Sequence, residues 1–392
     1  MDLSSYFEPI DPQVLDFQSM PMRPMLGDSL EAYLPGRPFP AWEPARLILL
    51  GVKEDRGSTD GRGEAEAPDH IRRMLYRLAK PYADLPMVDL GNIAPGESLR
   101  DTYFAVIEVM QRLLDGGRTV LLLGGSDDLV FPVYKAYEIL GNVINIASVD
   151  PRFSIEGGDE VNNANYLQHI ILQQPNYLFD YLNLGYQTYF VGQPMVKLME
   201  ELKFNTRRVG ELQQNIELAE PMLRYSDVVA VDVGVVRQSD APAAAAPSPH
   251  GLYGEQLCQL ARYAGMSDKT TTFGLFEMVP SRDRDHQTAH MLAHVAWFFI
   301  EGFCYRMGDL PSQDRQAYKR FSVQMEASGT ELVFYKSLKS DRWWIEVPCE
   351  DSERRARYRQ HTLIPCSYAD YQHAMQNEIP ALWWHYYNRF NG

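Results

Sequence analysis

The sequence predicts an α/β fold: a three-layer α-β-α sandwich around a mostly parallel, doubly wound sheet, followed by a small C-terminal α+β extension. Short apolar runs rich in β-forming residues alternate with stretches of helical spacing, which indicates a parallel sheet covered on both faces. Beyond about residue 308 this alternation stops and short strands follow one another. The 392 residues, 45% hydrophobic and 23% charged, suffice for one large domain with an added piece, or for two domains.

The expected elements follow one another regularly along the body of the chain. Strands are predicted at residues 46–52, 86–90, 119–123, 143–149, 187–191, 227–233 and 272–277. Helices are predicted at residues 67–79, 98–114, 128–140, 161–173, 193–203 and 253–265, and a long helix at about 284–307 closes this part. Right-handed crossovers give the doubly wound arrangement. We therefore place an α/β core at residues 46–308, preceded by a proline- and methionine-rich extended arm at residues 1–45.

Residues 309–392 form the predicted extension. Short strands are expected at residues 321–325, 331–336 and 342–348, and the last two are joined as a hairpin. A helix from about Tyr368 to Asn377 follows, N-capped by Ser367. The extension is rich in aromatic residues, namely Trp343, Trp344, Trp383, Trp384, Tyr386, Tyr387 and Phe390. These rings either bury the extension against the core or form an interface with a partner, and the two uses are compatible.

The composition excludes some classes of function. A net charge of −15, without a lysine- or arginine-rich run, argues against nucleic-acid binding, because such proteins carry a basic face. The four cysteines, at positions 258, 304, 349 and 366, have no metal-finger spacing, which indicates a reducing compartment. The N-terminus lacks the pattern of a secretion signal, and the longest apolar stretch, residues 293–303, is too short to span a bilayer. We therefore expect a cytoplasmic protein without membrane insertion.

Three segments with acidic residues each follow a predicted strand. Residues 121–128 read Leu-Leu-Leu-Gly-Gly-Ser-Asp-Asp, and residues 148–154 read Ser-Val-Asp-Pro-Arg-Phe-Ser. Residues 229–234 read Val-Ala-Val-Asp-Val-Gly, and Ser-Asp-Ala-Pro follows at residues 239–242. Open α/β sheets build their sites outside the carboxyl ends of their strands, so these segments are expected to meet.

In this order, the segments resemble the ureohydrolases: arginase, agmatinase and formimidoylglutamase. The corresponding motifs of that family are Gly-Gly-Asp-His, Asp-Ala-His-x-Asp and Asp-x-Asp, and they bring six ligands to two manganese ions. Residues 47–58 and 67–73 resemble the opening of the family fold, and Phe276-Glu-Met-Val-Pro280 resembles its Glu-x-Asn-Pro segment. The resemblance covers about residues 46–308 and implies an arginase-like sandwich, with Glu277 near the substrate.

The resemblance also shows which metal ligands are replaced. Asp127 stands where the first motif has its histidine, while Asp150 and Asp232 keep the first aspartates of the second and third motifs. Arg152 replaces the second histidine, and the last acids of these two motifs have become Ser154 and Gly234. An arginine stays protonated and cannot ligate a metal, so Arg152 would supply a cation in place of the metal.

Two functions follow from this pattern. The first is a degenerate, formimidoylglutamase-like pseudoenzyme with no cofactor, acting in binding or assembly as a homo-oligomer or with a protein partner, through its aromatic extension. The alternative is a manganese-dependent hydrolase of linear amidines that uses the remnant positions Asp127, Asp150 and Asp232, with Glu277 and Asp240 as candidates for substrate binding. In either case we predict that Arg152 pairs with Asp150, Asp232 or both.

A metal-free enzyme is a third reading, which would need a histidine base. The candidate bases are His250, His286, His290 and His294. None of them has a candidate nucleophile or acid at a spacing that indicates catalysis. A histidine on a helix is more often packed or solvated than catalytic.

Overall fold

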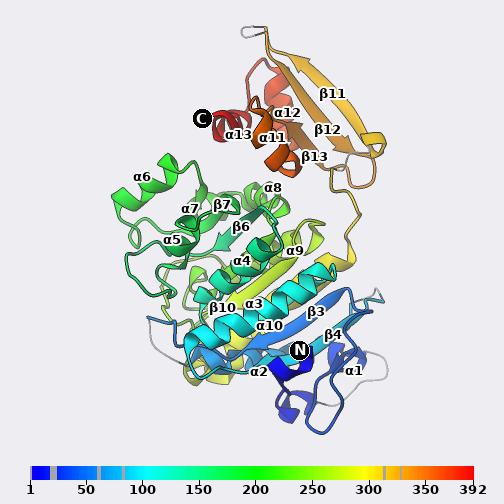
Figure 1. Ribbon diagram of the computed structural model, residues 1–392, viewed down its shortest axis with the longest axis vertical. Helices are drawn as coiled ribbons and strands as arrows, with labels where there is room; N and C mark the ends of the chain where they lie inside the picture. Colours follow the sequence, from blue (N-terminus) through cyan, green and yellow to red (C-terminus); the bar gives the residue numbers. More distant parts are fainter. Residues whose placement is uncertain (1, 18–23, 60–62, 82–83, 312–314, 327–328) are drawn as a thin grey trace.

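The computed structural model describes residues 2–17, 24–59, 63–81, 84–311, 315–326 and 329–392 (Figure 1). A ten-stranded sheet forms the centre, in the order β1-β4-β3-β5-β10-β9-β6-β7-β8, with β2 also paired to β4. Its strands are β1 (Phe7–Glu8), β2 (Glu31–Ala32), β3 (Leu47–Val52), β4 (Met87–Ile93), β5 (Thr119–Leu123), β6 (Ile144–Val149), β7 (Leu178–Tyr186), β8 (Asn205–Arg208), β9 (Val228–Asp232) and β10 (Thr272–Phe276). The pairing of β1 with β4 is antiparallel and the other pairings are parallel, which confirms the predicted fold class.

Two hydrophobic layers, one on each face of the sheet, follow from the alternation of side chains along the strands. In β5, Leu121 and Leu123 belong to one layer, and Val120 and Leu122 to the other. The first layer packs under α2 (Ala67–Leu75), α7 (Val209–Gln214), α8 (Ala219–Arg224), α9 (Gly254–Met266) and α10 (Gln287–Cys304). The second packs under α3 (Leu99–Asp115), α4 (Val130–Ile139), α5 (Tyr166–Ile171) and α6 (Gln193–Glu201).

The N-terminal arm lies along the edge of the core. Strands β1 and β2 both pair with β4, so the arm extends the sheet at this side. The arm also contains short helical turns and the single-turn helix α1 (Leu26–Ser29).

Several predicted elements differ from the structure. The helix expected at residues 161–173 is shorter, because α5 covers only Tyr166–Ile171, and β8, α7 and α8 were not predicted. The strand expected at residues 187–191 is wrong: that segment is a turn region, and the strand is β7, directly before it. Strand β7 carries Asp180 and Asn183, which are fully buried, so its sequence lacks a continuous apolar run. The long helix begins at Gln287 instead of about 284, because Asp285 and His286 have left-handed backbone conformations, with φ of 53° and 57°.

The C-terminal domain, as we call residues 315–392, is a four-stranded antiparallel sheet with helices against one face. Its elements are β11 (Tyr318–Gln324), β12 (Glu331–Ser337), β13 (Trp343–Glu346), β14 (Leu363–Cys366), α11 (Ser352–Arg357), α12 (Tyr368–Met375) and α13 (Ala381–Asn391). The predicted cap is confirmed: the Asp370 amide donates to Ser367 Oγ at 3.3 Å, and Ser367 N donates to Asp370 Oδ2 at 2.7 Å. The sequence had not predicted β14 or α13.

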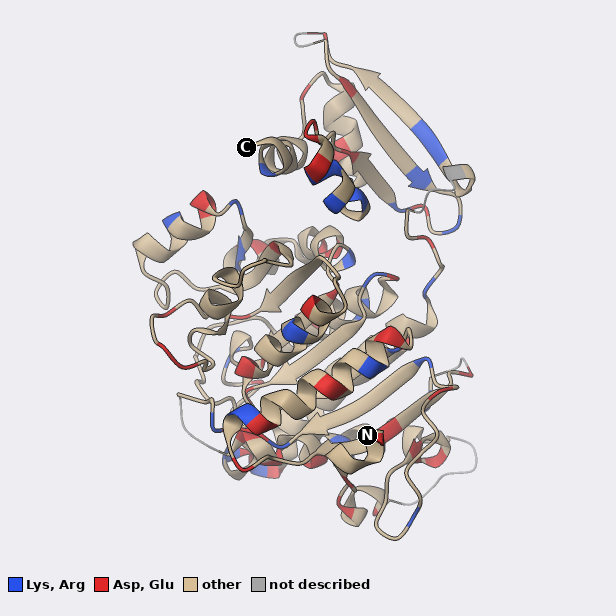
Figure 2. Ribbon diagram, in the orientation of Figure 1, with Lys and Arg blue, Asp and Glu red and all other residues tan. Residues whose placement is uncertain are grey.

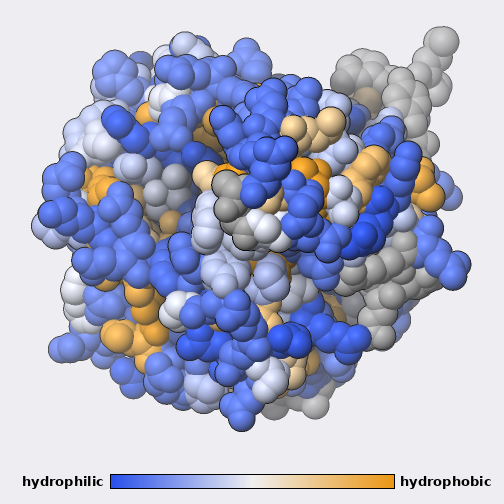
Figure 3. Space-filling model, turned by 90° about the horizontal axis from the view of Figure 1, so that it is seen from above, coloured by the Kyte–Doolittle hydropathy of each residue, from blue (hydrophilic) through white to orange (hydrophobic). Residues whose placement is uncertain are grey.

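Charged residues of both signs are interspersed along the helices of the core and of the C-terminal domain (Figure 2). Seen from above, towards the C-terminal domain, the surface is mostly hydrophilic, and hydrophobic residues form small separate patches (Figure 3). Half of the aromatic rings of this domain are buried, including Trp344, Trp383 and Phe390, and most of the others are half-buried. Trp384 is 46% exposed and Tyr368 is 53% exposed, so these two rings face solvent.

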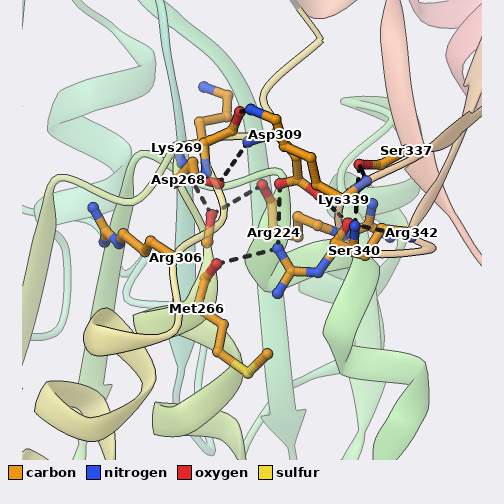
Figure 4. Close-up of polar contacts among 12 residues, drawn as sticks. Arg224, Met266, Asp268, Lys269, Arg306, Asp309, Ser337, Lys339, Ser340 and Arg342 are labelled. Atoms are coloured by element: carbon orange, nitrogen blue, oxygen red, sulfur yellow. Dashed lines mark hydrogen bonds and ion pairs between the residues drawn. The ribbon is translucent and has the colours of Figure 1, made fainter. Parts of the chain in front are cut away.

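The C-terminal domain is attached to the amino ends of the core strands. Phe179 of β7 and Tyr225, which precedes β9, pack in one hydrophobic cluster with residues of the domain. Arg224 donates to the carbonyl oxygens of Trp343 and Cys366, at 3.0 and 3.1 Å. Arg342 reaches back to the carbonyl oxygen of Met266, in the polar junction of Figure 4. These contacts leave the opposite edge of the sheet, the carboxyl edge, for a site.

Candidate functional site

Four acidic side chains meet at the carboxyl ends of four adjacent strands. Asp127 follows β5, Glu277 follows β10, Asp232 ends β9 and Asp150 follows β6, and these strands are neighbours in the sheet. All four line one pocket of about 30 Å³, together with Arg152, Ser154 and Asn163. We call it the acid pocket. Asp127, Asp150 and Glu277 are buried, and Asp232 is half-buried.

The backbone that holds these acids is tightly constrained. A side chain on Gly125 would place its Cβ 1.7 Å from the carbonyl oxygen of Glu54, so only glycine fits where the first motif turns. The Glu277 amide donates to the Gly125 carbonyl at 3.0 Å, and Glu277 Oε1 accepts from the Asp127 amide at 2.9 Å. Glu277 and Ser154 have positive φ, 68° and 47°, which is uncommon outside glycine and is often found at functional sites.

Two of the acids are held by the loops that follow their strands. Asp150 Oδ1 accepts from the Arg152 amide at 2.6 Å, and Asp232 Oδ1 accepts from the Gly234 amide at 2.6 Å. These are the short-range bonds of aspartates that fix a turn. Asp150 and Asp232 therefore shape their own loops as well as the acid pocket.

The acid pocket concentrates negative charge in a buried place. Burial, together with repulsion from Glu277, Asp150 and Asp232, raises the pKa of Asp127 well above its usual range. Burial and repulsion from Asp232 likewise raise the pKa of Glu277. Among the residues that the structure describes, no hydrogen-bond donor reaches Asp127 Oδ1, which lies inside the protein.

Arg152 brings a positive charge to the same pocket. Burial and Asp232 raise the pKa of Asp150, while the Arg152 guanidinium opposes that rise, so the cation acts on Asp150. Its guanidinium carbon also lies 5.4 Å from the centre of the Phe190 ring. Arg152 therefore lines the same pocket as the acids, and the pairing of its guanidinium with Asp150 or Asp232 stays a prediction.

The donors of the acid pocket do not fit a pair of manganese ions. The described residues that line it include carboxylates but no histidine. Nowhere in the described ranges do three or more histidine, cysteine, aspartate or glutamate residues have an arrangement suited to a metal ion. Arg152 would also place a fixed cation beside any metal bound to Asp150.

The two residues predicted for substrate binding lie in different places. Glu277 lies in the acid pocket, while Asp240 lies in a groove between α9 and α10, where its carboxylate accepts from Arg237 Nε at 2.9 Å and from the Gly254 amide at 3.0 Å. The alanine-rich loop at residues 243–250 does pass beside the acid pocket, because the Ala245 amide donates to the Glu277 carbonyl at 2.8 Å.

Two further residues belong to this region: Asn163, which was not predicted, and Asp128, which the sequence offers as a spare carboxylate beside Asp127. Asn163 donates to both carboxylate oxygens of Glu277 at 3.4 Å, and its own oxygen accepts from the Thr59 hydroxyl at 2.7 Å. Asp128 is fully buried and accepts from the hydroxyls of Tyr103 and Ser126. Asp128 sits in a recognisable motif, but no pattern in the sequence marks Asn163.

Comparison with known proteins decides the family. Residues 45–301 match the model of the Arginase family, which is well over half of the chain. The chain belongs to the arginase family. It is 25% identical to the formimidoylglutamase of Staphylococcus aureus strain MSSA476 over 271 residues, which cover 66% of this chain and 86% of the relative. The C-terminal domain lies beyond the span that matches the family.

Solved structures agree on the fold of this arginase-family protein. The formimidoylglutamase of Bacillus subtilis superposes with a TM-score of 0.65 at 18% identity, covering 74% of this chain and 96% of that one. The formiminoglutamase of Trypanosoma cruzi with Mn²⁺ gives a TM-score of 0.66 at 16% identity, covering 72% and 99%. In the described part of the chain, no helix has the length and hydrophobicity needed to cross a membrane.

Proposed function

We propose that this protein is a non-catalytic member of the arginase family, which uses the fold for binding or assembly. The main support is the replacement of the metal-binding histidine of the second motif by Arg152, whose charge acts on Asp150. A buried set of carboxylates without imidazole, beside a permanent cation, suits an internal ion cluster better than a centre that activates water.

Assembly through the C-terminal domain is part of this proposal. Half of its aromatic rings are buried, and Leu338, Tyr368, Met375 and Trp384 are its large exposed side chains. Aromatic anchors of this kind contribute much of the energy of protein interfaces. All four cysteines are free thiols, which supports a cytoplasmic location for the assembly.

The alternative function is a metal-dependent hydrolase of a formimino or guanidino substrate. Membership of the arginase family favours it. So does the Asp127 oxygen without a donor among the described residues, because such an oxygen is a candidate ligand for a hard cation. Three carboxylates could then hold one ion in place of two.

Metal analysis combined with an activity assay separates these functions. The purified protein, with and without added Mn²⁺, is analysed by mass spectrometry for bound manganese and assayed for release of urea or formamide from guanidino and formimino substrates. We expect no stoichiometric manganese and no activity above background. Manganese-dependent product release that is abolished by Asp232→Ala would establish the hydrolase and overturn the proposal.

A further inference from the structure

A second group of side chains lies outside the acid pocket, on the solvent face of α10. Three exposed histidines, His286, His290 and His294, recur every four residues at the start of this helix and along it. Residues four apart stand one above the other on a helix, so these rings form a row. His70 of α2 lies beside the row, with 6.2 Å between its ring centre and that of His286. Four of the nine histidines are therefore gathered in one place.

The row borders a large groove. His290 and His294 line a cavity of about 760 Å³ between α9 and α10, whose apolar lining includes Cys258, Met291 and Phe298. None of its described lining residues belongs to the acid pocket. A cavity of this size is in the range of ligand sites in proteins.

His290 and His294 have the arrangement of a chelating pair. Their ring centres are 6.4 Å apart, and two histidines at this spacing on one helix face can reach the same ion. Partial burial, with smaller effects of His294, His286 and Arg77, lowers the pKa of His290, which favours the neutral imidazole. A neutral imidazole is the form that binds a metal, and it prefers borderline transition metals to manganese.

We propose that His290 and His294 together bind one divalent transition-metal ion, such as Zn²⁺, Ni²⁺ or Cu²⁺, at the edge of this groove. Among the described residues, no third histidine, cysteine or acid completes the site. The remaining coordination positions then belong to water or to a small ligand in the groove. Such a ligand would carry a metal-binding group, and its apolar part would lie over Met291 and Phe298.

The test titrates the full chain, carrying no affinity tag, with Zn²⁺ at pH 7.5 against a chromophoric chelator, and follows Cu²⁺ by its electron paramagnetic resonance. We expect one tight equivalent with nitrogen coupling from two imidazoles. His290→Ala or His294→Ala should weaken binding roughly tenfold or more, since even loss of an outer-shell partner costs about 10–100-fold. His250→Ala removes an exposed histidine outside the groove and is the matched control.

Two results would overturn this assignment. One is a wild-type chain that binds less than one equivalent of Zn²⁺, and the other is a double variant, His290→Ala with His294→Ala, that binds as the wild type does. The outcome is independent of the proposed function. Manganese in the acid pocket would be lost in Asp232→Ala and kept in the histidine variants, while zinc at α10 would show the reverse.

Discussion

The two edges of the central sheet differ in how their acidic side chains are compensated by basic ones. At the amino edge, acidic side chains of the core are paired with basic ones, and so is Asp309, which lies between the core and the C-terminal domain. The pairs are Asp180 with Arg389, Asp227 with Lys269, Glu220 with Arg224 and Asp309 with Arg342. At the carboxyl edge, four buried or half-buried acids share a pocket with the exposed Glu156, and Arg152 is the basic residue among its described lining. Both edges are built by the same strands, so the difference lies in the side chains that follow or precede them.

The two edges therefore serve different purposes: the amino edge holds the C-terminal domain on the core, and the carboxyl edge forms the candidate site. The amino edge uses its charges to attach the C-terminal domain, as Arg342, Asp309 and Ser340 do in Figure 4. The carboxyl edge keeps like charges together, and it holds Glu277 and Ser154 in an uncommon backbone conformation. Features that cost stability without a local benefit are typical of functional sites or of their remnants. The carboxyl edge is therefore the better candidate for a functional site.

The largest expected effect comes from removing the partner of the amino edge. A chain that ends at residue 308 would uncover Phe179 and Tyr225, which are 4% and 2% exposed in the full protein. Each uncovered ring would cost about 2 kcal/mol, and Asp180 would lose Tyr386 and Arg389. We expect the shortened chain to aggregate or to lack a cooperative thermal transition in circular dichroism. A soluble core that melts at the temperature of the full chain would show that the domain is only an appendage.

Removal of a single arginine at this attachment should lower the stability by a smaller amount. Arg224 is 4% exposed, pairs with Glu220 at 2.9 Å and binds two carbonyls of the C-terminal domain. We expect Arg224→Ala to lower the free energy of unfolding by about 3–5 kcal/mol, because it leaves buried polar groups unpaired. Arg320→Ala is the control, since its pair with Glu331 is about half exposed and solvent screens an ion pair of this kind, so it contributes little to stability. Equal losses in chemical denaturation would contradict this contrast.

The sequence predicted the parts of this molecule that leave a local pattern. Strands such as β5 and β9 are uninterrupted apolar runs, and Asp127, Asp150, Asp232 and Glu277 were all named from the segments that follow or end such strands. Strand β7 was misplaced because Asp180 and Asn183 interrupt its apolar run, and both find their partners only in the folded chain. The attachment of the C-terminal domain was predicted only as packing. Its polar contacts join residues far apart in the sequence, such as Arg224 and Trp343, which lie 119 positions apart, and no local pattern records them.

At the carboxyl edge, removal of Arg152 should have a smaller and pH-dependent effect. Arg152 is half-buried, so we expect Arg152→Ala to cost about 2–3 kcal/mol at pH 8, less than a fully buried charge would. The loss should shrink at pH 5, because acids with raised pKa values then take up protons and need less compensation. Arg152→Lys keeps the charge, so its stability at pH 8 should lie between that of the wild type and that of Arg152→Ala. An Arg152→Ala protein with an unchanged melting temperature at pH 8 would remove the main support for an internal ion cluster.

The smallest expected effect has the opposite sign, because Asp128 should destabilise the protein at high pH. Burial raises the pKa of Asp128 to about 7, although the Ser126 and Tyr103 hydroxyls donate to it, whereas in the unfolded chain it ionises near pH 4. Between these values the folded chain holds the extra proton, so stability falls as the pH rises through this window. The full difference is at most about 4 kcal/mol at pH 8.

Asp128→Asn removes this ionisation but also one of the two oxygens that accept from Ser126 and Tyr103, so we expect a net gain of about 1–2 kcal/mol at pH 8. At pH 5 Asp128 is already protonated in the folded protein, and the gain should vanish or reverse. Thermal melting at both pH values measures the difference, with the exposed Asp159→Asn as a control. A variant that is less stable than the wild type at pH 8 would mean that the Asp128 carboxylate is stabilised where it lies, as the acids of the amino edge are.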